Sequence, residues 1–454
     1  MKKTSTYILV AAIASASAFS GCNPLVENND ISPNLPPDAP ADQQLTATQL
    51  GEGFVMSGEA ARTANIWAGV FTGEDRQYSA LQVYVAGLPD FDNMWTNSYY
   101  LVLQQTRLIQ EKARAVNNNH LLGIAQVLEA QMIGTVTSLW GDVPYSRAFV
   151  TGQPSPFDGQ AAVYTATQAL LDDAIANLGR NGVNPEARDI YYGGDLAKWR
   201  AAARSLKARY FLHVKNYAAA VAAAGQGIAK TDGDMIMPYK EAVSVSANPY
   251  WDFQKNSRPG YMSASQSYAA ELMLSRRNSK TNDTKRHDFF FVGGNLKTTT
   301  GGAFAIDADF PLISYVETQA ILAEALVRGG DAAGALTALN ATRTANEAVY
   351  GSSLADYTLA DFEAGGLLNN GTPALPRNEA LLKEILTEKY LSLVGQIEEF
   401  NDVRRTNNLI GVSKNVQSAP SLPQRFLVPQ VEVNTNPNAP NPPPGIFVKT
   451  PVNQ

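Results

Sequence analysis

Cysteine is almost absent from this chain. Among 454 residues there is one cysteine, Cys22, so no disulfide can form within the chain. An exported protein would be allowed disulfides, but this one cannot use them. Because 45% of the residues are hydrophobic, we expect the fold to be held together by its core alone.

Long apolar runs and basic blocks are also missing. After the first 21 residues, no stretch approaches the ~20 apolar residues that cross a bilayer, so we expect everything beyond the leader to be soluble. Lys and Arg total 36 against 42 Asp and Glu, which gives a net charge of -6. This balance argues against nucleic acid or anionic lipid as the main ligand.

Signatures of catalysis and metal binding are lacking as well. The three histidines, His120, His213 and His287, are far apart and none has a second ligand at helical spacing, so no zinc site is predicted. Phosphate-binding loops, nucleophile elbows and calcium-loop patterns do not occur. Glu398 and Glu399 are neighbours on a predicted helix and point to different faces, so they cannot act as a facing acid and base. We expect no enzyme and no obligatory cofactor.

The N-terminus has the layout of a lipoprotein leader. Lys2 and Lys3 precede an apolar run from Tyr7 to Phe19, which is typical of a secretory signal and too short to span a membrane. Phe19-Ser20-Gly21-Cys22 then reads as a lipidation box, and a lipidated Cys22 would tether the mature chain to a membrane surface. The alternative is an ordinary secretory signal that ends near a cysteine.

These features predict three parts. Residues 1–21 form a lipoprotein signal peptide. Residues 22–45 are polar, contain prolines and lack periodicity, so they are predicted to be the lipidated Cys22 and a flexible tether. Residues 46–454 are predicted to be a single domain.

Helices dominate that domain. Apolar residues recur at i, i+3, i+4 and i+7 in segments 91–116, 121–139, 161–178, 196–214, 218–229 and 378–393. Two pairs of alanines, Ala208 with Ala220 and Ala323 with Ala335, lie twelve residues apart in similar helix–turn–helix stretches. Small residues at these points let paired helices cross closely, as in tetratricopeptide-type repeats, although coincidence in an alanine-rich chain is the alternative. The predicted fold class is therefore an all-α scaffold of helix pairs with few short strands.

The stretch 232–310 has a different character. Helical periodicity fades there, and aromatic residues, Ser, Asn and Gly become frequent. A loop-rich insertion of this length is more often functional than passive. It includes the triplet Phe289-Phe290-Phe291, for which a buried strand and a patch on a partner protein are both open.

Several segments resemble the SusD/RagB family of nutrient-binding outer-membrane lipoproteins. The tail from Pro423 to Asn438 is similar to the family's closing signature, and Leu139-Trp140-Gly141-Asp142-Val143-Pro144-Tyr145 to its turn after an early helix. The segments 310–325 and 388–406 look like its late helix pair and its penultimate motif. Together with Cys22, these segments agree with the family in sequence order from one end of the chain to the other.

The resemblance implies a function. Members of the family capture oligosaccharides, in some cases peptides, and pass them to a SusC-like TonB-dependent transporter. This chain would then be anchored in the outer membrane by lipid alone, facing the cell exterior. Two alternatives stay open: a helical-repeat scaffold that binds protein or peptide partners and no small molecule, and a helical glycoside hydrolase.

Sugar rings stack on aromatic faces, and their hydroxyls need amide, carboxylate or guanidinium partners. Candidate ligand-binding residues are therefore aromatics in loops with polar neighbours. The first group is Tyr250, Trp251, Phe253 and Tyr261 with Arg258 and Asn248, for which a ring-filled core is the alternative. The second group is Trp67, Phe71, Tyr78 and Tyr84 with Glu74, Asp75 and Arg76. From it we take Trp67, Tyr78 and Arg76 as candidate ligand-binding residues, with core packing of Trp67 as the alternative.

Overall fold

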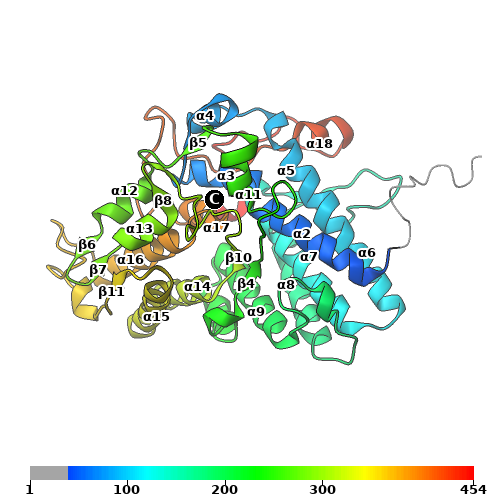
Figure 1. The fold of residues 1–454 in the computed structure, drawn as a ribbon, viewed down its shortest axis with the longest axis horizontal. Coiled ribbons are helices and arrows are strands. Elements are labelled where there is room, and N and C mark those ends of the chain that lie inside the picture. Colours follow the sequence, from blue (N-terminus) through cyan, green and yellow to red (C-terminus); the bar gives the residue numbers. More distant parts are fainter. Residues whose placement is uncertain (1–38) are drawn as a thin grey trace, which may run out of the picture.

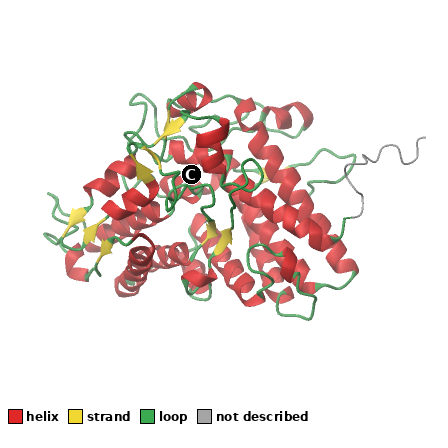
Figure 2. Ribbon diagram, viewed as in Figure 1, coloured by secondary structure: helices red, strands yellow, loops and turns green. Residues whose placement is uncertain are grey.

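Helices form most of the structure, as the sequence periodicity predicts (Figures 1 and 2). The structure is a computed structural model that describes residues 39–454, so the leader and Cys22 lie outside the described range. The helices are α2 (Ala41–Met56), α3 (Glu59–Trp67), α4 (Arg76–Gln82), α5 (Asp92–Asn97), α6 (Gln104–Ala115), α7 (Asn119–Trp140), α8 (Gln160–Asn177), α9 (Leu196–His213), α10 (Tyr217–Ala224), α11 (Pro249–Asp252), α12 (Tyr268–Ser275), α13 (Thr284–Phe290), α14 (Tyr315–Arg328), α15 (Ala332–Tyr350), α16 (Arg377–Ser392), α17 (Glu398–Arg405) and α18 (Gln430–Thr435).

The strands are short and pair only in small antiparallel sheets. They are β1 (Thr72–Gly73), β2 (Val143–Pro144), β3 (Phe157–Asp158), β4 (Met235–Met237), β5 (Met262–Ser263), β6 (Arg277–Asn278), β7 (Thr281–Asn282), β8 (Phe291–Val292), β9 (Asn295–Leu296), β10 (Phe310–Ile313) and β11 (Ser353–Leu354). β1 pairs with β5, β2 with β3, β4 with β10 and β8 with β9, while β11, β7 and β6 form a three-stranded sheet. Six of these strands, β4 to β9, lie wholly inside the predicted insertion, alongside the short helices α11, α12 and α13.

The two predicted alanine pairs lie at helix crossings. Ala208 of α9 and Ala220 of α10 are fully buried in one apolar cluster, and Ala323 of α14 and Ala335 of α15 are fully buried in another. In both pairs the second helix begins after a side-chain cap, supplied by Asn216 or by the equivalent Asp331. An N-cap oxygen satisfies a backbone N–H that the first helical turn leaves free. The helix-pair prediction is confirmed.

Two boundaries differ from the sequence-based expectation. Helix α2 begins at Ala41, inside the stretch 22–45 expected to be a tether. Its first turn is polar, and burial begins only at Leu45, so the sequence pattern resembled a linker. The helix expected over 218–229 ends at Ala224, because Gly225 and Gly227 follow and glycine favours helix termination.

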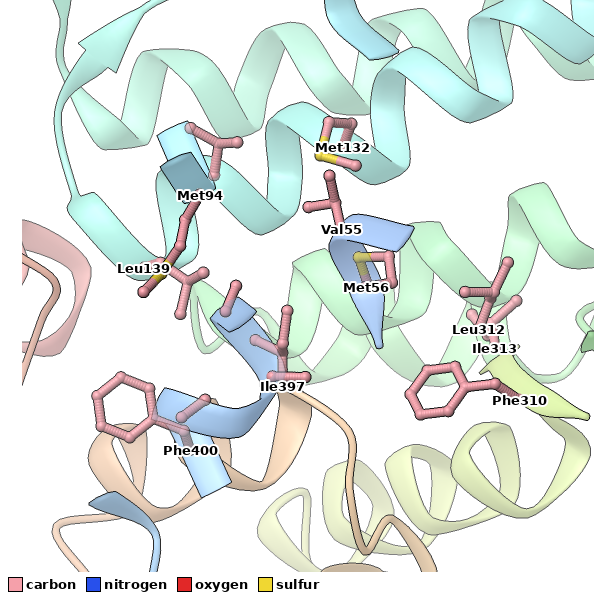
Figure 3. Packing of buried hydrophobic residues seen from close by; sticks show 14 of the residues in the cluster. Val55, Met56, Met94, Met132, Leu139, Phe310, Leu312, Ile313, Ile397 and Phe400 are labelled. Atoms are coloured by element: carbon pink, nitrogen blue, oxygen red, sulfur yellow. The ribbon is translucent and has the colours of Figure 1, made fainter. Parts of the chain in front are cut away.

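The main core lies where the early and late parts of the chain meet. Figure 3 shows Val55 and Met56 of α2 near Met132 of α7, with Ile397 and Phe400 from the α17 region approaching the same space. In Figure 1, α2, α6, α7 and α8 lie side by side on one side of the molecule, and α12, α13, α15 and α16 lie on the other. Between residues 39 and 454, no helix is both long and apolar enough to span a bilayer.

Hydrogen bonds from buried arginines connect α17 to the helices that precede it. Arg405 of α17 donates to both Glu324 of α14 and Asp402, and Arg404 donates to the backbone oxygens of Ser138 and Gln424. Guanidinium groups suit this role because their donors form a planar fork. These residues of the penultimate motif are therefore structural.

Candidate functional site

A short strand pair brings the two groups of predicted ligand-binding residues together. β1 and β5 pair antiparallel, with Thr72 opposite Ser263, and the backbone N–H of Glu74 donates to the carbonyl oxygen of Tyr261 at 2.8 Å. As a result, the start of α4 lies beside the loop that follows α11; both are at the top of the molecule in Figure 1. The sequence analysis treated these groups, almost 200 residues apart, as alternatives, whereas the structure makes them one surface.

Tyr261 occupies the centre of this surface. Its ring is half-buried, and the guanidinium carbons of Arg76 and Arg258 lie 5.7 Å and 5.9 Å from the ring centroid. Both arginines are exposed. Among the described residues, the Tyr261 hydroxyl has no hydrogen-bond partner. The surface therefore combines an aromatic ring with two exposed guanidinium groups, and Arg258 also donates to the Ser257 carbonyl oxygen. We call Arg76, Arg258 and Tyr261 the Tyr261 rim.

The backbone at Arg76 is strained. Its φ of 46° lies in the left-handed region, which costs a non-glycine residue about 1 to 3 kcal/mol and is more frequent at functional sites. Asp75 precedes it, accepts a hydrogen bond from its backbone N–H and lies 3.9 Å from its guanidinium group. This conformation sets the direction in which the side chain leaves the start of α4.

A buried layer supports the rim. The rings of Tyr78 and Phe253 lie 4.9 Å apart, and each contacts Tyr261 at about 6.4 to 6.5 Å. Arg62 lies 4.2 Å from the centroid of Phe253, and its Nε donates to the hydroxyl of Tyr78 at 2.8 Å. Burial raises the pKa of Tyr78, although Arg62 opposes the shift. Tyr78 and Phe253 are 1% and 7% exposed, so they hold Tyr261 rather than contact a ligand, which corrects their predicted role.

The loop between α11 and β5 is internally fixed. Residues Phe253–Ser257 form a π-helical turn, a feature that is frequent at functional sites. The Asp252 carboxylate accepts hydrogen bonds from Ser244, Asn256 and Ser257, and these bonds lower its pKa against the effect of burial. Trp251 is half-buried in α11, just before this loop.

Three other predicted residues are structural. Tyr250 is fully buried and its hydroxyl donates to the Gly395 carbonyl at 2.6 Å. Asn248 is also buried: its side chain caps α11 and donates to the Ala308 carbonyl. Trp67 is fully buried against Phe91, Phe400 and Phe426, and its Nε1 donates to the Leu81 carbonyl. Because their polar atoms and ring faces are already used inside the protein, the prediction that they contact a ligand is corrected.

Sequence reasoning missed a second aromatic surface. A groove of about 440 Å³ is lined by Tyr100, Phe149, Glu432 of α18 and Asn436, which follows that helix. Tyr100 and Phe149 are 48% and 39% exposed. Trp95, Tyr99 and Tyr100 begin a helix at spacings that favour packing, but adjacent tyrosines on a helix point in different directions. Tyr99 is packed and Tyr100 is not, which the Tyr-Tyr dipeptide could have indicated.

The acidic residues that might suggest catalysis are part of the core. Glu398 pairs with His213, whose Nε2 lies 2.8 Å from its carboxylate. Burial raises the pKa of Glu399 well above its usual range, and neither of its oxygens has a side-chain partner. Within residues 39–454, no group of three or more His, Cys, Asp or Glu side chains is arranged to hold a metal ion.

Comparison with known proteins identifies the family of this chain. A SusD-like family model, described as starch-binding and associating with the outer membrane, matches residues 40–429. The chain belongs to the SusD/RagB family. The expected helix-pair fold is confirmed, and the family is one of non-catalytic, carbohydrate-binding proteins associated with the outer membrane. No curated protein matches the chain.

Solved structures of SusD-like proteins share this fold. A SusD/RagB family protein from Bacteroides thetaiotaomicron is 22% identical, with 88% of this chain and 95% of that chain covered and a TM-score of 0.67. A chitin-binding SusD homolog from Flavobacterium johnsoniae is 19% identical, with 87% and 94% covered and a TM-score of 0.69. A SusD homolog from Parabacteroides distasonis is 15% identical, with 87% and 93% covered and a TM-score of 0.70. At these identities the likeness concerns the fold.

Proposed function

We propose that this SusD-like protein captures oligosaccharides at the Tyr261 rim and delivers them to a SusC-like TonB-dependent transporter. The observation that carries the proposal is the half-buried Tyr261 ring with the exposed guanidinium groups of Arg76 and Arg258 at 5.7 Å and 5.9 Å from its centroid. A sugar ring can stack its C–H face on Tyr261 while Arg76 and Arg258 donate to its hydroxyls. The family description and the chitin-binding homolog support a glycan as the ligand class.

The rim also suits a long ligand better than a small one. Trp251 is half-buried in α11, just before the same loop, and could offer a second ring to a chain of sugars that continues past the rim. Loss of one stacked ring should weaken binding by roughly 1 to 3 kcal/mol, on the scale of aromatic stacking and interface truncation. We therefore expect each aromatic residue to contribute a part of the affinity.

The test compares two tyrosines that are both covered by an arginine. Tyr261→Ala should weaken binding to soluble oligosaccharides of starch or chitin by roughly five- to hundredfold, measured by titration calorimetry. Tyr217→Ala is the matched control, because the Arg328 guanidinium covers the Tyr217 ring at 5.2 Å on helix α10, outside the rim. Equal affinity of both variants would refute the rim as the binding site. Binding lost together with the melting transition would instead mark Tyr261 as a structural residue.

The membrane anchor is part of the same proposal. Cys22, which lies outside the described residues, would carry the lipid, and the polar residues after it would lift the domain off the surface. In cells, Cys22→Ala should move the protein from the membrane to the soluble fraction, and labelled fatty acid should no longer be incorporated. A variant that stays with the membrane would contradict the anchor. Copurification of the wild-type protein with a TonB-dependent barrel tests the transporter partnership.

The alternative of a protein- or peptide-binding scaffold predicts a different dependence. It requires contacts on the helix pairs and no small-molecule ligand, so substitution at the rim would leave partner binding unchanged. The exposed rim favours the glycan proposal, since a scaffold has no need of an arginine-flanked tyrosine in the insertion.

A further inference from the structure

A cavity of about 440 Å³ lies apart from the rim, between α15, the loop that precedes β10 and the end of α16. Its volume falls in the range typical of small-molecule sites. None of the residues of the Tyr261 rim lines it. We call it the Phe289 cavity, after the first residue of the phenylalanine triplet that the sequence analysis left open between a buried strand and a surface patch.

Aromatic rings form the walls of the Phe289 cavity. The rings of Phe289 and Phe290 lie 5.1 Å and 5.5 Å from that of Tyr350, and Phe304 lies 6.2 Å from Phe290. Phe290 and Phe304 are buried, whereas Phe289 and Tyr350 are half-buried. Further apolar lining comes from valines of α14, α15 and the α16–α17 turn. A ligand must therefore offer an apolar body.

The charged side chains that line the cavity are all acidic. Asp234, Asp307 and Asp309 line it, and no Lys, Arg or His does. Asp234 is partly buried and accepts a hydrogen bond from the backbone N–H of Tyr315 at 2.7 Å. Burial raises the pKa of Asp234 to about 7, and the charges of Glu317 and Asp232 act in the same direction. A cleft with charges of one sign attracts ligands of the opposite sign.

One buried side chain in the cavity is left without a partner. Gln396 is only 7% exposed and lines the cavity. Its backbone carbonyl accepts a hydrogen bond from Asn65, but its side-chain amide bonds to no other described residue. Its amide atoms are not among the side-chain atoms that are shut off from solvent without a partner, so a ligand in the cavity can reach them. Its neighbour in the lining, Asn346, donates to Glu388 and Ser392 and so is already engaged.

We propose that the Phe289 cavity binds an amphipathic organic cation, in which an ammonium or guanidinium group is attached to an apolar chain or ring. The aromatic walls take the apolar body and also attract positive charge through their faces. The three carboxylates face the charge, and Gln396 can bond to a polar group of the ligand. An anion would be repelled, and a free sugar would bury hydroxyls against rings that cannot hydrogen-bond to them.

Three probes with one carbon skeleton separate these properties. 4-Phenylbutylamine carries a cation, 4-phenylbutanol is neutral and 4-phenylbutyrate is an anion. Binding to the purified protein is followed by titration calorimetry and saturation-transfer NMR at pH 7.5, above the pKa of about 7 of Asp234. We expect the amine to bind, the alcohol to bind roughly three- to tenfold more weakly, and the acid not to bind. Absence of amine binding, or equal binding of amine and alcohol or of amine and acid, would overturn the proposal.

Three variants test whether the amine binds in the Phe289 cavity. Asp307 and Asp309 are exposed, so the double substitution D307N/D309N should fold and should weaken the amine without affecting the alcohol. Val349→Trp, at a position that lines the cavity and is 56% exposed, should fill the space and abolish binding of both. Asp173→Asn removes the same charge from an exposed site on α8 and should change nothing. Amine binding that survives Val349→Trp at full strength would place the ligand elsewhere and refute the assignment.

Discussion

The pH dependence of stability should reveal a buried carboxyl group in α2. Glu52 is fully buried, and burial raises its pKa to about 8 from an ordinary value of 4.5. A hydrogen bond from the Tyr191 hydroxyl at 3.1 Å and the charge of Arg209 oppose the shift without cancelling it. The other carboxyl oxygen has no partner. Glu52 is therefore neutral in the folded protein at pH 7, whereas it is ionised in the unfolded chain.

The sign and size of the effect follow from this difference. A raised pKa in the folded state means that the group's contribution is fully present below pH 4.5 and is lost as the pH rises toward 8. The loss amounts to about 1.4 kcal/mol for each pH unit in this interval. Between pH 5 and pH 8, Glu52 should lower the free energy of unfolding by roughly 3 to 4 kcal/mol. This is an upper figure, because water that penetrates to a buried carboxylate reduces the cost of ionising it.

The substitution Glu52→Gln isolates this contribution. Glutamine has the same shape, can still accept a hydrogen bond from Tyr191 and never ionises. Urea unfolding followed by tryptophan fluorescence should give similar stabilities for both proteins at pH 5, with the variant progressively more stable toward pH 8. Glu363→Gln, at an exposed residue paired with Arg377, is the control and should show no such divergence. Parallel curves for wild type and Glu52→Gln would refute the reasoning.

Two further predictions concern packing and acid stability. Gly134→Ala should destabilise the protein by about 1 to 3 kcal/mol, because an added Cβ on α7 would overlap the buried ring of Tyr210, whereas Gly445→Ala, with no atoms near its added Cβ, should be neutral in the same thermal melts. On the acid side, burial alone would raise the pKa of Glu324, but Arg405 holds it at about 2, so stability should fall as the pH drops from 4.5 toward 2. An unfolding midpoint in urea that stays constant over this acid range would contradict the second prediction.

The helical scaffold could be predicted because its determinants are local. The alanine at the fourth position after the cap, Ala220 in one pair and Ala335 in the other, recurs with the same spacing and lies at a crossing in both cases. Each helix pair is specified within about thirty residues, so a single sequence contains the pattern. The predicted helix over 218–229 extends past the true end of α10 at Ala224, because the alanine-rich pattern continues while Gly225 and Gly227 end the helix.

For the candidate site, the sequence predicted the types of residue but not which of them are exposed. The sequence indicated that aromatics and arginines in the insertion and near Arg76 were suited to a glycan, but not which rings face outward. Tyr250 and Trp251 are adjacent in α11, yet Tyr250 is fully buried and Trp251 is half-exposed. Tyr250 faces inward because its hydroxyl donates a hydrogen bond to the carbonyl oxygen of Gly395, which lies far along the chain. Long-range partners of this kind leave no trace in local periodicity.

The division between buried and exposed rings has a functional reason. Tyr78 and Phe253 were expected to bind a ligand, and the structure instead places them directly below Tyr261, where Arg62 fixes both. A stacking surface gains affinity when its ring is already held in place, because less side-chain freedom is lost on binding. The buried rings thus belong to the site even though they cannot contact a sugar, and each of the two predicted groups contributes residues to both layers. Substitution of the lower layer should therefore weaken glycan binding and stability together, whereas substitution of Tyr261 should weaken binding alone.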